Sequence, residues 1–170
     1  MKGQGDSSRG DGGSRFLVVN GYHVLVWPGF AERWQRLRAE VERLRESDPE
    51  GYRDKPATKL LAAVRDATLR DIPQDPGADR YRQGNTLGAG YRHWRRVKMF
   101  QRFRLLFRYS NDPALIAYVW LNDDSTLRKT GARTDAYAVF RGMLERGQPP
   151  TDWEHLVREC RAWSDRDVGP

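Results

Sequence analysis

The stretch RHWRRVKMFQRFRLLFRYS, residues 92–110, decides the fold because a strand pattern and a dense positive charge coincide in it. Side chains alternate between the two faces of a strand. If residues 94–99 and 103–109 are strands, every odd position except Arg95 is apolar and most even positions are basic. The sequence therefore predicts a hairpin with one core face and one cationic face. The basic side chains are Arg96, Lys98, Arg102, Arg104 and Arg108.

The shared parity also constrains the turn of this hairpin. Residues directly opposite in an antiparallel pair lie on one face, so a three- or five-residue loop centred on Gln101 is required. This register places Lys98 opposite Arg104 and Arg96 opposite Leu106. Like charges in opposite positions destabilise a sheet, and a bound anion would relieve the repulsion. The alternative is a solvated outer face whose long side chains splay apart.

The charge of the whole chain is concentrated in this hairpin. The 170 residues include 30 Lys+Arg and 23 Asp+Glu, a net charge of +7. The opening stretch holds seven cations and no carboxylate, so the remainder is neutral. A focused patch favours a polyanionic partner, with nucleic acid first, an acidic protein second and a membrane surface third.

Several classes of site are disfavoured by composition. A single cysteine, Cys160, cannot form an internal disulfide, and with three histidines it argues against a zinc site. GNTLGAG (84–90) is not followed by the Gly-Lys-Ser/Thr of a phosphate-binding loop. We expect no metal and no cofactor. No apolar run approaches a membrane span and no signal peptide is visible, so we expect a soluble, cytoplasmic protein.

The rest of the chain reads as a small α+β domain. We expect a Gly/Ser-rich disordered tail at 1–15, one domain at 16–163 and a C-terminal tail at 164–170. Residues 16–27 predict one or two strands broken at Asn20-Gly21. Apolar residues at helical spacing predict a helix over 30–44, and a second helix beginning near Pro56 would pair with it. The segment 73–92 is either a functional loop or disordered.

The C-terminal half adds a strand and two helices. LIAYVWLN (115–122) is apolar on both faces and suits a central strand. A helix follows within 134–150, with Thr134 or Asp135 as N-cap, and Thr151 with Glu154 would form a capping box for the last helix. The order β-α-α-β-β-β-α-α predicts a largely antiparallel sheet. In such a meander Arg128, Lys129 and Arg133 would lie beside the hairpin and turn its basic face into a groove.

Several stretches together resemble the YhaV toxins, the RelE-like ribonuclease half of bacterial toxin–antitoxin modules. The resemblance covers nearly everything from residue 20 to about 160. The stretches are NGYHVLVWPGF (20–30), DPEGY (48–52), KPATKLLAAV (55–64), WRRVKMFQRFRLLFRYS (94–110), WLNDDSTLRKTG (120–131), TDAYAVFRGML (134–144) and ERGQPPTDWEHL (145–156).

The resemblance implies a RelE-like fold: a mainly antiparallel four-stranded sheet with two N-terminal helices packed on it and additional C-terminal helices. It implies the toxin of a type II toxin–antitoxin system, an endoribonuclease (mRNA interferase) that cuts mRNA, on or off the ribosome, and blocks translation. RelE-like enzymes work without metal, by attack of the ribose 2′-hydroxyl on the adjacent phosphate. The implied partner is a PrlF-type antitoxin with an AbrB-like fold, and DNA would be reached only through it.

The resemblance also implies roles for residues. The catalytic candidates are Arg96, Lys98, Arg104 and Arg128, with Lys98 as general base and Arg104 gripping the phosphate. The candidate RNA-binding residues are Arg95, Arg102, Arg108, Lys129 and Tyr137. Tyr137 would stack on a base or carry a proton.

His93 lies directly before the first strand of the basic hairpin. It has the parity of the core, so we interpret it as a structural or loop residue rather than as an acid or base.

Two alternatives to a ribonuclease remain for the basic patch. A non-catalytic RNA- or ribosome-binding module would explain the charge equally well. A DNA-binding regulator would place its base-reading side chains on a helix, and here most cations lie on strands.

Overall fold

A central sheet organises the computed structural model, which describes residues 15–169. In the described part the sheet has six strands in the order β1-β2-β5-β4-β3, with β6 also paired to β2. Strands β2 and β5 are parallel, and the other pairs are antiparallel. The strands are β1 (Val18–Val19), β2 (Tyr22–Val26), β3 (Arg95–Met99), β4 (Phe103–Asn111), β5 (Ala114–Leu121) and β6 (Arg161–Ala162).

The α+β class is confirmed, but the expected four-stranded sheet is wrong in two respects. Strands β1 and β6 have two residues each, too few to show an alternating pattern in the sequence. The second respect is the parallel pairing of β2 with β5, which are separated in the chain by several helices and the basic hairpin. A connection of that length permits parallel pairing, which a tight turn does not.

The basic hairpin forms in the predicted register. Lys98 lies opposite Arg104 and Arg96 opposite Leu106, and the pair of Met99 with Phe103 leaves a three-residue turn centred on Gln101. Phe100 and Gln101 adopt left-handed backbone conformations, with φ of 45° and 64°. Residues other than Gly and Asn are uncommon in this conformation, so Phe100 occupies a strained position at the tip.

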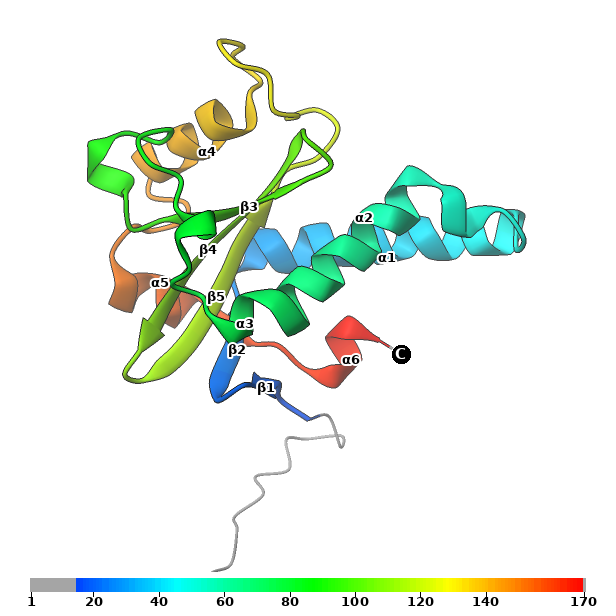
Figure 1. The fold of residues 1–170 in the computed structure, drawn as a ribbon, viewed down its shortest axis with the longest axis horizontal. Helices are drawn as coiled ribbons and strands as arrows, with labels where there is room; N and C mark the ends of the chain where they lie inside the picture. Colours follow the sequence, from blue (N-terminus) through cyan, green and yellow to red (C-terminus); the bar gives the residue numbers. More distant parts are fainter. Residues whose placement is uncertain (1–14, 170) are drawn as a thin grey trace, which may run out of the picture.

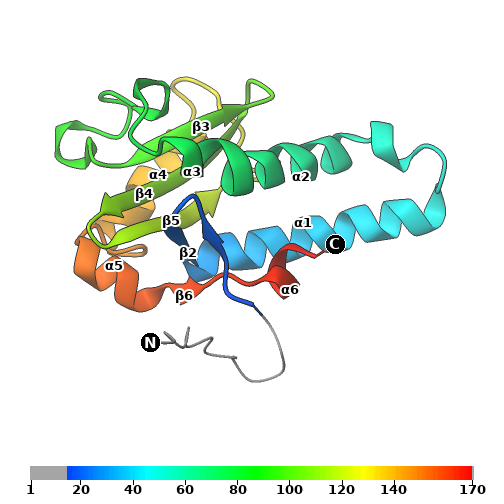
Figure 2. The same ribbon diagram turned by 60° about the horizontal axis from the view of Figure 1, so that its bottom comes forward.

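One face of the sheet is covered by α1 (Pro28–Ser47) and α2 (Pro56–Asp66), which run antiparallel beside each other (Figure 2). Both predicted helices are confirmed. A π-helical turn, Ala67–Asp71, extends α2 into α3 (Ile72–Gln74). The core on this face receives the apolar odd-numbered hairpin side chains, and it also contains Phe30, Trp34, Val64, Tyr118 and Trp163.

The opposite face carries α4 (Ala136–Glu145) and α5 (Trp153–Glu159), so the sheet is sandwiched between two helical layers (Figure 1). Leu106, Val119 and Phe140 are fully buried in this second core. A β-bulge between Leu106 and Phe107 shifts the pairing with β5, which turns both Val119 and Trp120 toward this core. The even-numbered face of the hairpin is therefore partly covered by helices.

The connection at 73–92 is ordered. It contains single helical turns at Asp79–Tyr81 and Ala89–Tyr91, and the Tyr81 and Leu87 side chains are buried. The buried Gln83 amide accepts hydrogen bonds from the Leu87 N–H and the Thr86 hydroxyl. Internal hydrogen bonds and two buried apolar side chains thus hold this segment in place. Of the two expectations for it, disorder is therefore wrong.

Two expectations near the C-terminus need correction. The cap of α5 is Asp152, whose carboxylate accepts from the His155 N–H; the Thr151 hydroxyl instead contacts His93 and Trp94. Residues 165–168, expected in a tail, form α6 (Asp165–Val168) with Val168 buried, a four-residue helix too short for a periodic signal. The tail expected at 1–15 lies outside the described residues except for Arg15.

Among residues 15–169, no helix has the length and apolar character that crossing a membrane requires.

Candidate active site

Two basic residues from different elements meet at Tyr137, in the first turn of α4. The Arg104 side chain, on β4, donates from Nε to the Tyr137 hydroxyl over 3.1 Å. The Arg128 guanidinium carbon lies 4.8 Å from the centroid of the Tyr137 ring, within the range of a cation–π contact. Strand and loop thus place two positive charges around one phenol, which is itself 4% exposed.

The position of Arg104 is fixed from several directions. Its Nη1 donates to the carbonyl oxygens of Gln101 and Phe103, each over 2.8 Å. Its backbone N–H donates to Asn122 Oδ1 over 2.7 Å, and Asn122 is fully buried after β5. These bonds leave Arg104 only 6% exposed, and none of them uses Nη2. The guanidinium is therefore held rigidly, with one nitrogen left for a ligand.

Arg128 is positioned by Asp135, the N-cap residue of α4. Arg128 Nη1 lies 2.6 Å from Asp135 Oδ1, and the same oxygen accepts from the Lys129 N–H over 2.6 Å. Burial raises the pKa of Asp135, but the hydrogen bonds from Arg128 and Lys129 outweigh it, so that the net pKa lies below the usual range. Asp135 is thus a carboxylate at neutral pH, and it orients the Arg128 guanidinium beside Tyr137.

This cluster opens to the surface through a hollow of about 340 Å³. Arg141 lies in its lining and pairs with Glu145 over 3.2 Å. A polyanion entering the hollow would meet Arg128 and Tyr137 directly. The hollow is lined by Thr86, Arg128, Asp135, Tyr137, Ala138, Arg141, Gly142 and Glu145.

Arg96 and Lys98 lie in a second hollow, of about 620 Å³, where β3 faces the 73–92 connection and the end of α2. Arg96 Nη1 donates to the Arg80 carbonyl over 2.6 Å. Lys98 is exposed and lies opposite Arg104 in the strand register. Lys98 thus lines this hollow and also neighbours Arg104 across the hairpin. Among the described residues, Arg96 shares no hydrogen bond, ion pair or ring contact with Arg104, Arg128 or Tyr137.

The remaining predicted RNA-binding residues have different surroundings. Arg102 and Lys129 are exposed. Arg95 stacks on Tyr109, with 5.4 Å from its guanidinium carbon to the ring centroid. Arg108 lies between the rings of Trp94 and Trp153, and burial lowers its pKa to about 10 against the opposing effect of Asp152.

Two residues of the site were not among the predicted functional residues. Asp135 was expected only as an alternative helix cap, and Asn122 only as the end of a strand. Asp135 follows Arg128 by seven residues in the sequence, and this proximity is a signal for their ion pair. No feature of the sequence indicates a role for Asn122. Within the described part of the chain, no three His, Cys, Asp or Glu side chains gather in a way that could hold a metal ion.

Comparisons with known proteins point to one family. The model of a family described as a toxin with endonuclease activity, of a toxin–antitoxin system, matches residues 24–161. The ribonuclease toxin YhaV of Escherichia coli (strain K12) is 48% identical over 143 residues, covering 83% of this chain and 93% of that protein. The toxin YhaV of Escherichia coli O6:H1 is 47% identical with the same coverage. No solved structure matches the chain. This chain therefore belongs to the YhaV toxin family, whose members are endonuclease toxins of toxin–antitoxin systems.

Proposed function

We propose that this protein is an endoribonuclease toxin of a type II toxin–antitoxin system, which cleaves mRNA and so inhibits translation. The observation that carries the proposal is the placement of Arg104 and Arg128 around the Tyr137 phenol beside an open hollow. The proposal is also supported by the name of the 48% identical relative, a ribonuclease toxin. A RelE-type fold is part of the same proposal, and the antiparallel β3-β4-β5 unit with two helices from the N-terminal half supports it.

The proposed reaction is an internal transesterification. The ribose 2′-oxygen forms a bond to the adjacent phosphorus, the bond to the 5′-oxygen breaks, and a 2′,3′-cyclic phosphate remains. Lys98 accepts the proton of the 2′-hydroxyl, and the Tyr137 hydroxyl supplies a proton to the departing 5′-oxygen. No metal takes part in these steps.

Electrostatic stabilisation is the main contribution of the arginines. Negative charge grows on the phosphate oxygens in the transition state. Fixed cations that face these oxygens stabilise the transition state most where water is partly excluded. Arg104 Nη2 and the Arg128 guanidinium are the groups that would face these oxygens. Both are held by protein contacts before substrate arrives, so little reorganisation accompanies the reaction.

The RNA backbone would continue from this cluster past Lys98 toward Arg96. Contacts to phosphates give affinity without reading the base sequence. We assign this role to Arg95, Arg102, Arg108 and Lys129. A PrlF-type antitoxin with an AbrB-like fold, action on ribosome-bound mRNA and contact with DNA only through the antitoxin belong to the same proposal, as does a cytoplasmic location.

Cleavage of a defined RNA oligonucleotide in excess EDTA tests the chemistry. We expect RNA to be cut to a cyclic-phosphate product, and the same oligonucleotide with 2′-O-methyl groups to remain intact. Cleavage of the methylated strand would exclude 2′-oxygen attack. RNA that binds but is never cut, with or without translating ribosomes, would instead indicate a binding module.

Arg96→Ala tests whether the second hollow belongs to the site. We expect it to abolish growth arrest in a bacterial host and RNA cleavage, while the protein stays folded. Arg80→Ala is the matched control, because Arg80 lines the same hollow and its side chain contacts Tyr81. Full toxicity of a folded Arg96→Ala protein would remove Arg96 from the site.

A further inference from the structure

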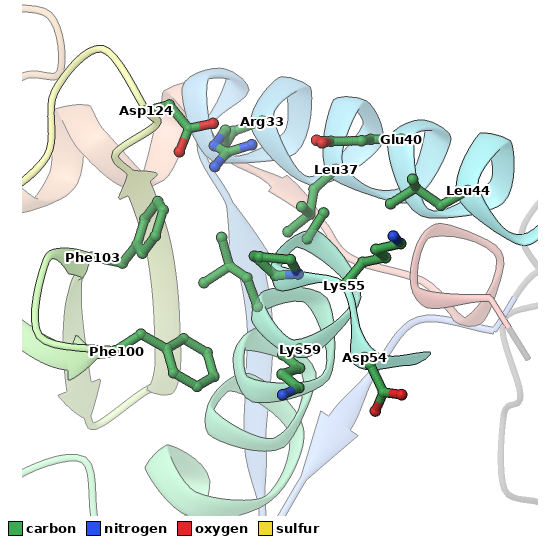
Figure 3. A pocket seen from close by; sticks show the side chains of 13 residues that line it. Arg33, Leu37, Glu40, Leu44, Asp54, Lys55, Lys59, Phe100, Phe103 and Asp124 are labelled. Carbon is green, nitrogen blue, oxygen red and sulfur yellow. The ribbon is translucent and has the colours of Figure 1, made fainter. Parts of the chain in front are cut away.

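Two of the remaining hollows differ sharply in charge. One, of about 470 Å³, lies between the hairpin tip and helices α1 and α2 (Figure 3). Its charges balance, because three carboxylates face three cations: Glu40, Asp54 and Asp124 against Arg33, Lys55 and Lys59. The other, of about 500 Å³, has three arginines and no carboxylate in its lining. We call it the arginine hollow, and its lining residues are Arg82, Gly84, Asn85, Arg92, His93 and Arg95.

The backbone sets two of these arginines against each other. Arg82, in the 73–92 connection, and Arg95, at the start of β3, form an antiparallel β-bridge. Side chains at directly opposite positions lie on the same face, and like charges there destabilise the pairing. The Arg95 guanidinium also has a buried Nη1 without a hydrogen-bond partner within residues 15–169. An anion in the hollow would offset both the repulsion and this buried charge.

Few contacts within the protein compete for these guanidiniums. Arg92 donates from Nε to the Asn85 side-chain oxygen over 2.8 Å, and in the described part of the chain its terminal nitrogens enter no hydrogen bond or ion pair. Arg82 pairs with Asp79 over 3.3 Å, but both side chains are well exposed, so the pair is weak and a ligand can replace it. Guanidiniums that are free in this way bind phosphate oxygens in a bidentate manner.

The arginine hollow is preformed, because the buried Gln83 side chain holds the segment around it. Gln83 Nε2 donates to the Tyr91 carbonyl over 2.8 Å, and its Oε1 accepts from the Leu87 N–H over 3.2 Å. Arg82 precedes Gln83 and Arg92 follows Tyr91, so the bond between Gln83 and Tyr91 brings the two arginines to the same hollow. A ligand then meets cations already in place, which lowers the entropic cost of binding.

A single turn separates the arginine hollow from the 340 Å³ hollow beside Tyr137, which we call the catalytic hollow. Asn85 lines the first, and Thr86, the next residue, lines the second. The turn lies beside α4 (Figure 1), and Leu87 packs in the same core as Phe140 of that helix. A nucleic acid strand that leaves the catalytic hollow over this turn therefore enters the arginine hollow. This continuity favours RNA over an acidic protein as the occupant.

We propose that the arginine hollow binds a backbone phosphate of the RNA substrate, next to but distinct from the scissile phosphate, with Arg82, Arg92 and Arg95 as its donors. The inference rests on the proposed function in that the ligand is RNA. A phosphate held here fixes the position of the strand relative to Tyr137 and adds affinity, but it takes no part in bond breaking. It carries no sequence information, because a phosphate contact reads no base.

The test measures binding of a non-cleavable 2′-O-methyl RNA to the double variant Arg82→Gln/Arg92→Gln. Both side chains are exposed, so the fold should be kept. The matched control is Arg43→Gln/Arg158→Gln, which removes the same charge from exposed positions on α1 and α5. RNAs with one uncharged methylphosphonate linkage, placed at each position in turn, show which phosphate the hollow holds. Binding of polyglutamate, an acidic polypeptide, is measured in parallel.

We expect the double variant to weaken RNA binding by about tenfold, as for the loss of charge-assisted hydrogen bonds. The slope of log K against log salt should fall by about 0.7, the value for one phosphate on a single strand. The control double variant should keep the affinity and the slope of wild type. One methylphosphonate outside the scissile linkage should weaken binding to wild type to a similar extent and should not weaken the double variant further.

Wild-type RNA affinity of Arg82→Gln/Arg92→Gln, or an equal loss in the control, would overturn the proposal. So would a methylphosphonate effect that persists undiminished in the double variant, since the phosphate would then lie elsewhere. A loss confined to polyglutamate binding would also overturn it, because the hollow would then suit an acidic protein. If wild type bound RNA through this hollow but left unmodified RNA intact, the proposed function would fail and this inference would stand.

Discussion

The Arg104 guanidinium donates through Nε to the Tyr137 hydroxyl over 3.1 Å, across a sequence separation of 33 residues. Because the phenol oxygen accepts this bond, its own proton is available to another acceptor, and Tyr137 Oη donates to no group among residues 15–169 in the structure. The Arg128 guanidinium lies against the same ring. The arrangement is therefore a proton donor flanked by two cations, which suits the departure of an alkoxide from a phosphate.

Removing only the hydroxyl tests this assignment. We expect Tyr137→Phe to lower kcat for RNA cleavage on the order of 10²-fold with KM little changed. The variant should also lose about 1–3 kcal/mol in unfolding free energy, since Arg104 Nε is left without a partner. Denaturant unfolding and single-turnover cleavage measure the two effects.

Tyr118→Phe is the control for this pair of measurements. Its buried hydroxyl donates to the Thr68 carbonyl over 2.6 Å, in the core on the other face of the sheet. It should cost similar stability and leave kcat unchanged. Equal losses of kcat in both variants would assign Tyr137 a structural role.

The ion pair that positions Arg128 predicts a pH-dependent stability. The pKa of Asp135 is lower in the folded protein than its usual value of 3.8, so its stabilising contribution is complete above that value and is lost as the pH falls through the folded pKa. We expect Asp135→Asn to cost about 1–3 kcal/mol at about pH 7, where a hydrogen-bonded charge is lost. The difference from wild type should shrink toward about pH 3. A pH-independent difference in urea unfolding would contradict this.

Sequence patterns were sufficient for the hairpin and the helices because these depend on local periodicity. The parity of residues 94–109 predicted the pairing of Lys98 with Arg104 and the turn centred on Gln101, both confirmed. The apolar spacing over 30–44 predicted α1, whose Phe30, Trp34, Leu37 and Val41 are buried. The register of an antiparallel pair and the buried face of a helix both follow from the periodicity of residues that are close together in the sequence.

The assembly of the site depends on contacts that no local pattern contains. Parity placed Arg104 on the basic face, but its burial results from the packing of α4 against β4, which brings in Tyr137. The parallel pairing of β2 with β5 joins segments some 90 residues apart, as in the pair His23 and Leu115. Arg96 was expected in one catalytic cluster with Arg104, whereas its side chain donates to the Arg80 carbonyl in the 73–92 connection.

Salt dependence tests the RNA contacts outside the catalytic cluster. Lys129 is exposed next to Arg128, so its ammonium would contact a backbone phosphate. We expect Lys129→Gln to weaken binding of a non-cleavable 2′-O-methyl RNA and to reduce the slope of log K against log salt by about 0.7, the value for one phosphate contact on a single strand. Arg158→Gln, on the exposed side of α5, should leave the slope unchanged. Identical slopes for wild type and Lys129→Gln would remove Lys129 from the interface.

His93 provides the last prediction, because an imidazole near a basic site is an obvious candidate for acid–base catalysis. Its Nε2 lies 3.0 Å from the Thr151 hydroxyl, and burial together with the Arg108 charge lowers its pKa from the usual 6.5. Since the unfolded chain then binds the proton more readily, the contribution of His93 to stability should decline as the pH falls below 6.5. We expect His93→Gln to remove this decline while its pH–rate profile for RNA cleavage stays parallel to that of wild type. A limb of the wild-type profile near pH 6.5 that disappears in His93→Gln would instead make the imidazole part of the chemistry.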